Sequence, residues 1–311
     1  MTNIWSKFKK PILALAPMAG YTDPAFRLIC LKNKADIVYT EMVSVEAIWR
    51  KNKKTLQMLK TLPQEKNIIL QLFGNKAESF QKALKIINTS NFSGIDINLG
   101  CPAHKVTKTG SGAALMNNMD IAKEIIQTTL DNTKLPISIK IRSQVKNTSA
   151  IEFIEYIKDL KISAVMIHGR SLKQGFTGKI DIQTIKKIKQ LLPNIPVLTN
   201  GGINTPEQAK EILEKTNTDG IGIARGAWGN PWIFLALSRA KRGIPLSKSP
   251  NLSKIHKTMV NHAELFLKQN KDLTSLRKHL LHYIKGQKNA GELRKQIIKI
   301  KKLEDLKNLF L

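Results

Sequence analysis

Eight short apolar runs rich in β-branched residues recur along the chain, and segments with helical periodicity separate them. The runs are continuous rather than alternating, which is typical of parallel strands buried on both faces. They cover residues 12–16, 37–40, 68–73, 95–99, 137–141, 164–168, 196–199 and 220–224. Eight strand–helix units in this length predict an α/β fold of the TIM (β/α)8 barrel type. A doubly wound sheet is the alternative, and the strand count and regular alternation favour the barrel.

Several of the helical segments begin with a recognisable capping pattern. Thr205 precedes a proline at the first helical position and a glutamine at the third. Asn75 and Ser149 each stand three residues before a glutamate, which follows the same logic. These patterns predict helix starts at three of the barrel's helices.

The pattern changes near residue 244. Residues 243–250 combine glycine, prolines and serines, which is typical of a linker. Only helical segments follow it, over residues 252–269, 273–284 and 291–302. We therefore expect a TIM barrel catalytic domain over residues 1–243 and a small all-α helical domain over residues 244–311.

The chain is strongly basic, with 51 Lys and Arg against 23 Asp and Glu and a formal net charge of +28. Such a charge favours a nucleic-acid partner, with an anionic membrane surface as the alternative. A lysine-rich, AT-biased genome explains part of it. The last 67 residues carry +10 and the first 244 carry +18, so charge density is about twice as high in the helical segment. A merely soluble face usually mixes signs, so this excess predicts a surface that binds phosphates.

Two cysteines, Cys30 and Cys101, cannot form a disulfide framework or a four-thiolate metal site. The apolar stretch near the N-terminus is interrupted by prolines and a glycine, and no apolar run approaches the roughly 18 residues of a membrane span. We expect a cytoplasmic protein with no membrane contact, no metal ion and no obligatory protein partner.

Polar residues gather where the apolar runs end, which is where barrels place their active sites. Lys140 and Gln71 lie inside apolar runs, where an unpaired polar group is costly, and an anionic flavin ring would be a suitable partner for each. Gly201, Gly202 and Arg225 follow the last two strands, where barrels often bind phosphate. The glycines alone are equally well explained as turn residues.

Cys101 follows the fourth expected strand and begins a long loop rich in glycine. A lone cysteine is usually a small buried apolar residue, which is our interpretation of Cys30. Cys101 differs by its position, because a neutral thiol at the mouth of a barrel can deliver a proton to a carbon atom. His168 ends the sixth strand, and we expect either contact with a flavin or a structural role.

Taken together, these residues resemble the tRNA-dihydrouridine synthase family, most closely its bacterial DusB-like branch. The matching segments, over about residues 12–235, are APMAGYTDPAFR, YTEMVSVEAI, LQLFG, GIDINLGCPAHKV, GSGAALM, SIKIR, MIHGRSLKQGFTG, LTNGGI and ARGAWGNPWIF. The resemblance implies an FMN-binding barrel and a helical tRNA-binding domain. It implies reduction of the 5,6 double bond of specific uridines in tRNA, with NADPH or NADH as the transient reductant. Reduced FMN would give hydride to C6, and Cys101 would protonate C5.

The resemblance also implies roles for individual residues. Cys101 would be the catalytic proton donor, and Asn98, Lys105 and Arg170 would approach the uracil or nearby RNA. The cofactor would contact Pro17, Met18, Ala19, Gln71, Lys140, His168, Asn200, Gly201, Gly202, Ala224 and Arg225. Tyr21 and Phe176 depart from the residues that are usual at these places in the family.

Two alternatives remain open. An FMN-dependent barrel oxidoreductase that acts on a free pyrimidine or another small molecule would share the cofactor site, but it has no use for a basic helical tail. An RNA-binding module that has lost its chemistry would not need Cys101, Lys140 and Arg225 together.

Overall fold

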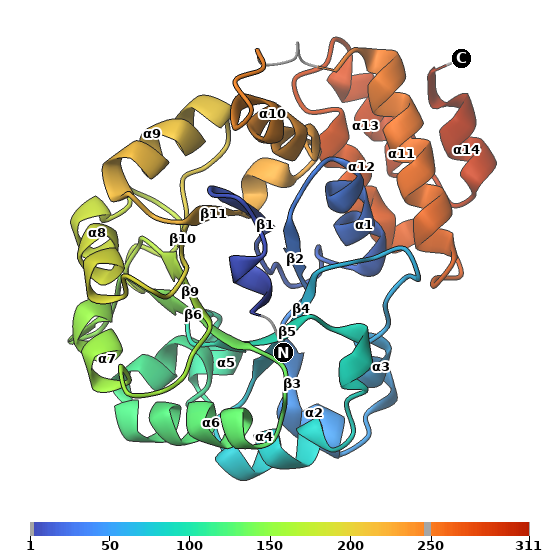
Figure 1. Cartoon of the computed structure of the whole chain (residues 1–311). Coiled ribbons are helices and arrows are strands. Elements are labelled where there is room, and N and C mark those ends of the chain that lie inside the picture. The colour runs from blue at the N-terminus through green and yellow to red at the C-terminus, as the bar shows by residue number, and fades with distance from the viewer. Residues whose placement is uncertain (1–2, 246–249, 311) are drawn as a thin grey trace.

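The computed structural model describes residues 3–245 and 250–310, and it shows eight parallel strands closed into a barrel (Figure 1). Closure follows from three pairings, since β1 pairs with β2 and β11, and β2 also pairs with β4. The TIM barrel prediction is therefore confirmed. The barrel strands are β1 (Ile12–Leu15), β2 (Ile37–Tyr39), β4 (Ile68–Phe73), β5 (Gly94–Asn98), β6 (Ile137–Arg142), β9 (Ala164–His168), β10 (Val197–Asn200) and β11 (Gly220–Ile223).

Three further strands are too short to leave a periodic signal in the sequence. Strand β3 (Val43–Ser44) pairs with the end of β4, and β7 (Gln144–Val145) pairs with β8 (Thr148–Ser149) in a separate hairpin. The hairpin follows β6 directly, so it extends the loop at the carboxyl end of that strand.

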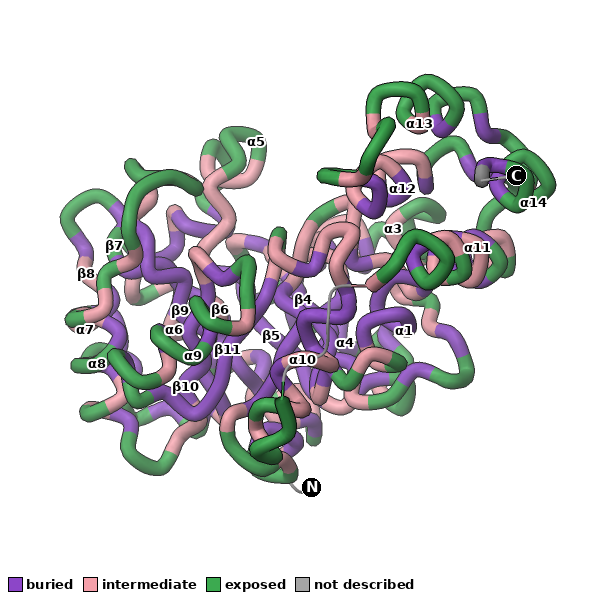
Figure 2. The backbone as a smooth tube through the Cα atoms, turned by 90° about the horizontal axis from the view of Figure 1, so that it is seen from above, coloured by how far each residue is buried: buried purple, intermediate pink, exposed green. Residues whose placement is uncertain are grey.

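Helices surround the barrel as an outer ring (Figure 1). They are α1 (Pro24–Lys32), α2 (Val45–Trp49), α3 (Lys53–Gln57), α4 (Ala77–Leu84), α6 (Met119–Asp131), α7 (Ala150–Tyr156), α8 (Ile182–Leu191), α9 (Pro206–Thr216) and α10 (Trp232–Ala240). The short α5 (His104–Thr107) belongs to the loop after β5, at the carboxyl end of the barrel (Figure 2). The side chains of Thr205 and Ser149 cap α9 and α7 as predicted. The prediction for Asn75 is wrong, because α4 begins one residue later and the Asn75 amide donates to the Thr109 carbonyl instead.

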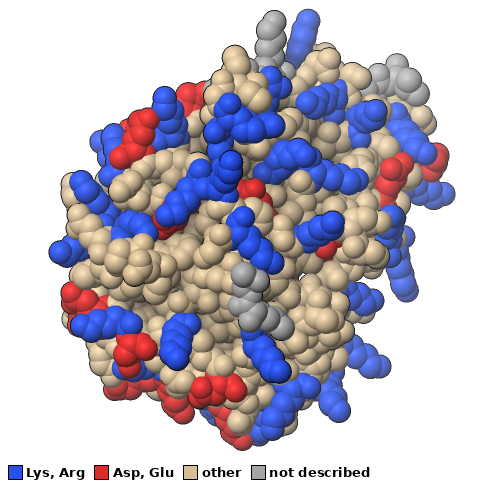
Figure 3. Space-filling model, in the orientation of Figure 1, with Lys and Arg blue, Asp and Glu red and all other residues tan. Residues whose placement is uncertain are grey.

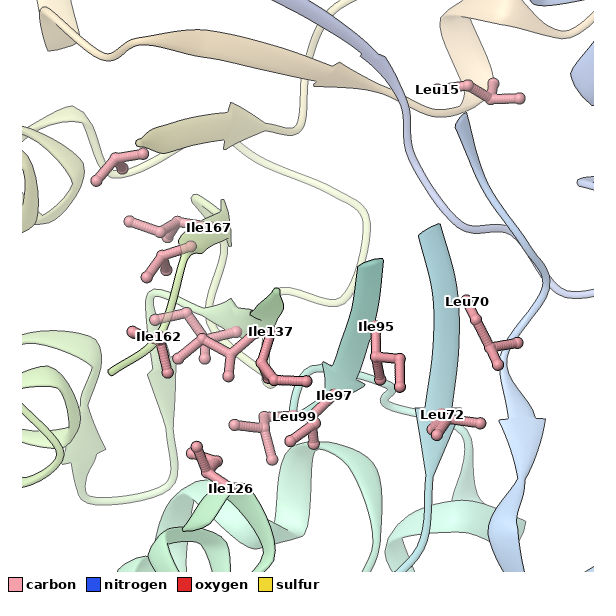
Figure 4. Packing of buried hydrophobic residues seen from close by; sticks show 14 of the residues in the cluster. Leu15, Leu70, Leu72, Ile95, Ile97, Leu99, Ile126, Ile137, Ile162 and Ile167 are labelled. Carbon is pink, nitrogen blue, oxygen red and sulfur yellow. The ribbon is translucent and has the colours of Figure 1, made fainter. Parts of the chain in front are cut away.

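Alternate residues of each strand face opposite sides of the barrel wall, because side chains in a strand alternate with a period of two. One set packs outward against the helices, and Figure 4 shows strand residues such as Ile95 and Ile97 in this layer with Ile126 of α6. The other set fills the barrel interior and includes Met166 and Leu198, and Trp5 from the segment before β1 packs among these residues. The inward positions become polar toward the carboxyl ends of the strands, which prepares a polar site at that end.

The tail consists of α11 (Leu252–Leu267), α12 (Arg277–Tyr283), α13 (Ala290–Ile297) and α14 (Leu303–Lys307), the last of which the sequence did not predict. Helical spacing over residues 273–284 places Leu273, Leu276, Leu280 and Ile284 on one face, and all four side chains are buried at 0% exposure. These residues share one hydrophobic core with side chains of α1, so the tail packs directly on the barrel. Part of the expected linker, residues 246–249, lies outside the described residues, and the division at residue 243 stays a prediction.

The two ends of the barrel differ. The short 3-10 helix Ile4–Ser6 closes one end, where the Trp5 indole donates to the Tyr39 hydroxyl inside the barrel (3.1 Å). Figure 2 shows α5, α12 and α13 at the end opposite the N-terminus. Within the described part of the chain, no helix combines the length and the apolar character that a membrane crossing requires.

Candidate active site

A cavity of about 630 Å³ lies at the carboxyl ends of the strands. It brings together the expected residues Pro17, Met18, Ala19, Gln71, Asn98, Cys101, Lys140, His168, Arg170, Asn200, Gly201, Gly202, Ala224 and Arg225. Lys105 is the exception, because it is exposed on α5 and does not line the cavity. The cavity size suits a cofactor or a drug-sized ligand.

The loop after β1 is anchored to a buried ion pair through Thr22. The Thr22 hydroxyl accepts from the Met18 backbone N–H (3.1 Å), and the Thr22 carbonyl accepts from the Arg27 guanidinium (2.8 Å). Arg27 in turn makes a two-pronged contact with Glu65 at 2.7 and 3.1 Å, and both side chains are almost completely buried. This arrangement fixes the backbone of the cavity floor at Met18.

Asn98 positions the loop that carries Cys101. Its side-chain oxygen accepts from the backbone N–H groups of Gly100 (3.2 Å) and Cys101 (2.9 Å). Its amide nitrogen donates to the Gln71 side-chain oxygen (2.9 Å), and the Gln71 amide donates to Asp96 (2.7 Å). Both polar atoms of Gln71 therefore have protein partners, which gives Gln71 a role in orienting Asn98.

Asp96 ends this chain of hydrogen bonds inside the barrel. Its side chain is fully buried, and burial raises its pKa to about 6, against the hydrogen bonds from Ser138 and Gln71 and the charge of Lys140. The Ser138 hydroxyl donates to the Asp96 carboxylate at 2.5 Å. A carboxylate with two donors and a nearby cation makes a stable anchor for the polar inward positions.

Lys140 projects from β6 into the cavity, where its ammonium donates to the Asn200 side-chain oxygen (3.1 Å). The Asn200 amide donates to the Gly222 carbonyl (2.7 Å), which fixes the orientation of that side chain. Burial, and then the charge of Arg142, lower the pKa of Lys140 to about 8, although Asp96 and Cys101 oppose the change. The ammonium is thus retained at neutral pH in an environment that would gain from an anionic ligand.

His168 is neutral in this cavity. Burial, followed by the charges of Lys140, Arg142, Arg170 and Arg225, lowers its pKa to about 2. The Arg170 guanidinium lies 3.5 Å from His168 Nε2, and a guanidinium can only donate, so Nε2 is the acceptor in this contact. A neutral imidazole can hydrogen-bond to a ring or a hydroxyl without adding charge.

The loops after β10 and β11 form a cradle. Gly201 has a φ of +114°, and a Cβ atom there would lie 2.8 Å from His168 Cδ2, so only glycine fits. Gly202 has a φ of +70°. The exposed Arg225 adds a guanidinium that donates to the Phe176 carbonyl (3.1 Å). Close backbone approach beside a guanidinium suits a phosphate group, and Lys140 suits an anionic ring, so the residues present fit FMN.

Further residues line the cavity that the sequence did not single out as site residues, namely Tyr21, Met42, Arg142, Phe176 and Trp228 among others. Arg142 lies two residues after Lys140 on the same strand, so its inward position follows from the strand period. Its guanidinium donates to the carbonyls of Gly100, Ser171 and Gly175 and so ties two active-site loops together. Tyr21 and Trp228 carry no comparable signal in the sequence.

One cluster of possible metal ligands lies outside the cavity. The ligand atoms of Asp23, His262 and His279 are all within 4.8 Å of one another at the junction of α1 and the tail. Asp23 caps α1 and lies 3.4 Å from His279 Nε2, while His262 Nδ1 lies 3.2 Å from the Tyr283 hydroxyl. Burial raises the pKa of Asp23, but the contacts with His279 outweigh it and lower the pKa to about 2. The cluster links the barrel to the tail, and the buried Nε2 atoms of His262 and His279 have no hydrogen-bond partner among the described residues.

Comparisons with known proteins identify the family of this chain. The family model described as "Dihydrouridine synthase (Dus)" matches residues 14–310. A protein named tRNA-dihydrouridine synthase B from Pasteurella multocida is 33% identical over 279 residues, which cover 88% of this chain and 83% of that protein. Its namesake from Xanthomonas campestris is 31% identical and covers 91% of this chain and 87% of that protein.

Solved structures show the same fold at low sequence identity. A 2-naphthoyl-CoA reductase matches with a TM-score of 0.58 and 10% identity, and it covers 75% of this chain. A histamine dehydrogenase from Rhizobium sp. 4-9 matches with a TM-score of 0.57 and 12% identity over 82% of this chain. This chain spans about half the length of each of these two structures, 50% and 49%. With a family model that covers nearly all of it, the chain belongs to the dihydrouridine synthase family.

Proposed function

We propose that this enzyme reduces the 5,6 double bond of specific uridines in tRNA, with FMN as the cofactor and NADPH or NADH as the transient reductant, in the cytoplasm. The observation that carries the proposal is the convergence in one cavity of a thiol at Cys101, a cation at Lys140 and a glycine cradle beside Arg225. Family membership supports it, since the relatives reported above are named tRNA-dihydrouridine synthases.

The proposed cofactor contacts follow the walls of the cavity. Pro17, Met18 and Ala19 would line one side of the flavin, and Lys140 and His168 would contact its ring or ribityl chain. The other contacts of the ring and chain would be Gln71 and Asn200, and those of the phosphate Gly201, Gly202, Ala224 and Arg225. Bound FMN, once reduced, supplies the hydride for C6 of the uracil.

Cys101 supplies the proton for C5 in this proposal. Asn98 holds the backbone N–H of Cys101, so the thiol is presented from a fixed loop. Loss of the proton leaves a thiolate, and Lys140 and Arg142 are close enough to interact electrostatically with it. Stabilising the charge that develops during the transfer is what such preorganised cations contribute. Asn98 and Arg170 would also contact the uracil, and the exposed Lys105 would contact RNA outside the cavity.

The tRNA would be bound through its phosphates. Figure 3 shows Lys and Arg side chains spread over both the barrel and the tail, while Asp and Glu are fewer on the same face. We assign residues 1–243 to catalysis and residues 244–311 to tRNA binding, where the charge density is higher. The target base must leave its stack to reach the cavity, which costs less in a loop than in a duplex.

The test is an assay with purified enzyme, FMN and NADPH. The substrate is tRNA from a strain that lacks dihydrouridine, and the product is measured by mass spectrometry of the digested nucleosides. We expect dihydrouridine at defined positions and no turnover of free uridine. Steady turnover of free uridine without any product in tRNA would overturn the proposal in favour of a small-molecule oxidoreductase.

A further inference from the structure

The wall of the cavity next to α12 is aromatic. Tyr21, after β1, and Trp228, after β11, both line the cavity and are half-buried. Their ring centroids are 4.3 Å apart with an interplanar angle of 26°, so the two rings stack. The proton and hydride transfers proposed above give neither ring a role. We call this pair of residues the aromatic wall.

Helix α12 of the tail completes the surroundings of the aromatic wall. Lys278 Nζ lies 5.1 Å from the centroid of the Tyr21 ring, and the His282 ring lies 4.8 Å from the Trp228 ring. Gly229 has a φ of +63°, and a Cβ atom there would lie 2.2 Å from the His282 carbonyl carbon. The loop after β11 therefore touches α12 without room for a side chain, so the aromatic wall has a fixed position between barrel and tail.

The Lys278 ammonium is able to bind an anionic ligand. Lys278 is half-buried, and within residues 3–245 and 250–310 no carboxylate lies within 4.0 Å of its ammonium. The acidic group it influences is Glu41, whose carboxylate accepts from the Gly20 backbone N–H. Burial, together with His279 and Lys285, lowers the pKa of His282, which keeps that neighbour neutral. A cation in this position, beside a cavity and above an aromatic ring, can bind a phosphate oxygen.

We propose that the aromatic wall and Lys278 form a binding site for the nucleotide next to the target uridine. The neighbouring nucleobase stacks on the face of the Tyr21 ring away from Trp228, which the Lys278 ammonium now covers, and the flexible Lys278 side chain moves off that face to bind the phosphate that joins the two nucleotides. Extruding one base removes stacking from its neighbour, and aromatic side chains replace such stacking with little preference for the base. The proposal rests on the proposed function, because it requires a uridine in RNA to enter the cavity.

The protein side is tested with four variants. Tyr21→Ala removes the stack, Tyr21→Phe retains it, and Lys278→Met removes the charge. Lys161→Met is the matched control, because Lys161 is exposed and precedes β9 at the opposite end of the barrel. We expect Tyr21→Ala to weaken tRNA binding on the order of ten- to a hundredfold, and Tyr21→Phe to change it by less than about threefold. FMN content is measured for every variant so that affinities are compared at equal cofactor loading, and only the control Lys161→Met is expected to leave kcat and tRNA affinity unchanged.

Salt dependence separates the role of Lys278 from packing. The slope of log affinity for tRNA against log salt should fall by about one in Lys278→Met, as expected for one lost phosphate contact, and stay unchanged in Lys161→Met. If Lys278→Met and Lys161→Met have the same slope, Lys278 binds no phosphate and the proposal fails.

The RNA side is tested with the unaltered enzyme, so that a misfolded variant cannot decide the outcome. The position reduced by this enzyme is mapped first, and tRNA transcripts are then made with an abasic nucleotide on either side of it. We expect one of the two abasic tRNAs to bind the unaltered enzyme more weakly than the complete tRNA, on the order of tenfold. The Tyr21→Ala variant should bind that abasic tRNA and the complete tRNA with the same, weakened affinity. If neither abasic tRNA binds more than about twofold more weakly, the aromatic wall only joins the barrel to the tail. Absence of any dihydrouridine at the mapping stage would instead overturn the proposed function.

Discussion

Replacing Lys140 should stabilise the protein while it abolishes cofactor binding. Lys140 is held in the cavity by one hydrogen bond to Asn200 (3.1 Å), and burial lowers its pKa from an ordinary value of 10.5 to about 8. A lysine whose charged form is disfavoured by folding reduces stability at every pH where it is protonated. Lys140→Met removes that cost and retains most of the side-chain volume. It also removes the cation that we expect the flavin to need.

The size of the effect follows from the two pKa values. A change from 10.5 to about 8 corresponds to about 3 kcal/mol against the folded state at pH 7. Lys140 keeps some contact with solvent, which screens part of this cost. The variant also leaves the Asn200 oxygen without its donor, at a cost of about 1 kcal/mol. We therefore expect Lys140→Met to raise the free energy of unfolding of the cofactor-free protein by about 1–2 kcal/mol at pH 7.

The pH dependence of the free energy of unfolding is a second test of whether charged Lys140 destabilises the folded protein. Below pH 8 Lys140 is charged in both the folded and the unfolded chain, so the full cost applies. Between pH 8 and 10.5 the unfolded chain binds a proton that the folded chain does not, so the wild-type protein gains stability as the pH rises. Above pH 10.5 the cost of the charge is absent, so the stabilisation should disappear and the variant should be less stable than wild type by about the 1 kcal/mol of the lost Asn200 contact.

Urea unfolding at pH 7 and at pH 10.5 measures the free energy of unfolding of cofactor-free wild type and Lys140→Met. Lys161→Met is the control, because it removes the same charge from an exposed position. FMN titration of the same samples should show loss of binding only in Lys140→Met. A variant that is less stable than wild type at pH 7, or a difference that does not depend on pH, would refute the reasoning.

Three other variants test neighbouring parts of the site. Cys101→Ala should keep its yellow colour and its affinity for tRNA but form dihydrouridine about 10²–10⁴-fold more slowly, and a fully active variant would remove Cys101 from the mechanism. Gly201→Ala should weaken FMN binding at least about tenfold in a fluorescence titration, because its Cβ would lie 2.8 Å from His168 Cδ2; an unchanged affinity would contradict the cradle. Arg27→Met leaves Glu65 buried without its partner and should lower the free energy of unfolding by about 3–5 kcal/mol. Adding Glu65→Leu to Arg27→Met should recover much of the loss, and a loss below about 1 kcal/mol in the single variant would contradict the ion pair's role.

The sequence was most informative where a residue conflicted with its surroundings. A lysine inside an apolar strand has to point into the barrel and find a partner, so Lys140 was recognisable without a structure. The same strand period places Arg142 in the cavity, two positions further on. The first signal of a barrel, eight apolar runs with helical segments between them, is also local and therefore readable.

Other features depend on contacts between distant segments. Tyr21, Trp228 and Lys278 meet only because α12 docks against the loops after β1 and β11, and no local pattern encodes that docking. Gln71 lines the cavity as expected, but its hydrogen bonds to Asn98 and Asp96 join three strands and could not be predicted from the sequence. Short elements such as β3 and α14 contain too few residues to show a hydrophobic period. The side chain of Asn75 does not cap α4, because its amide donates to the Thr109 carbonyl in another loop.

Helix α1 contributes side chains to two separate hydrophobic cores. Phe26 and Cys30 pack into the layer around the barrel, while Ala25, Leu28 and Ile29 belong to the core of the tail. The unit that could be exchanged between relatives is therefore the tail together with α1, although more than two hundred residues separate them in the sequence. A chimera cut at the linker alone would pair one protein's α1 with another's tail and bury a mismatched surface. The boundary between the two cores therefore runs through α1, and it does not coincide with the linker in the sequence.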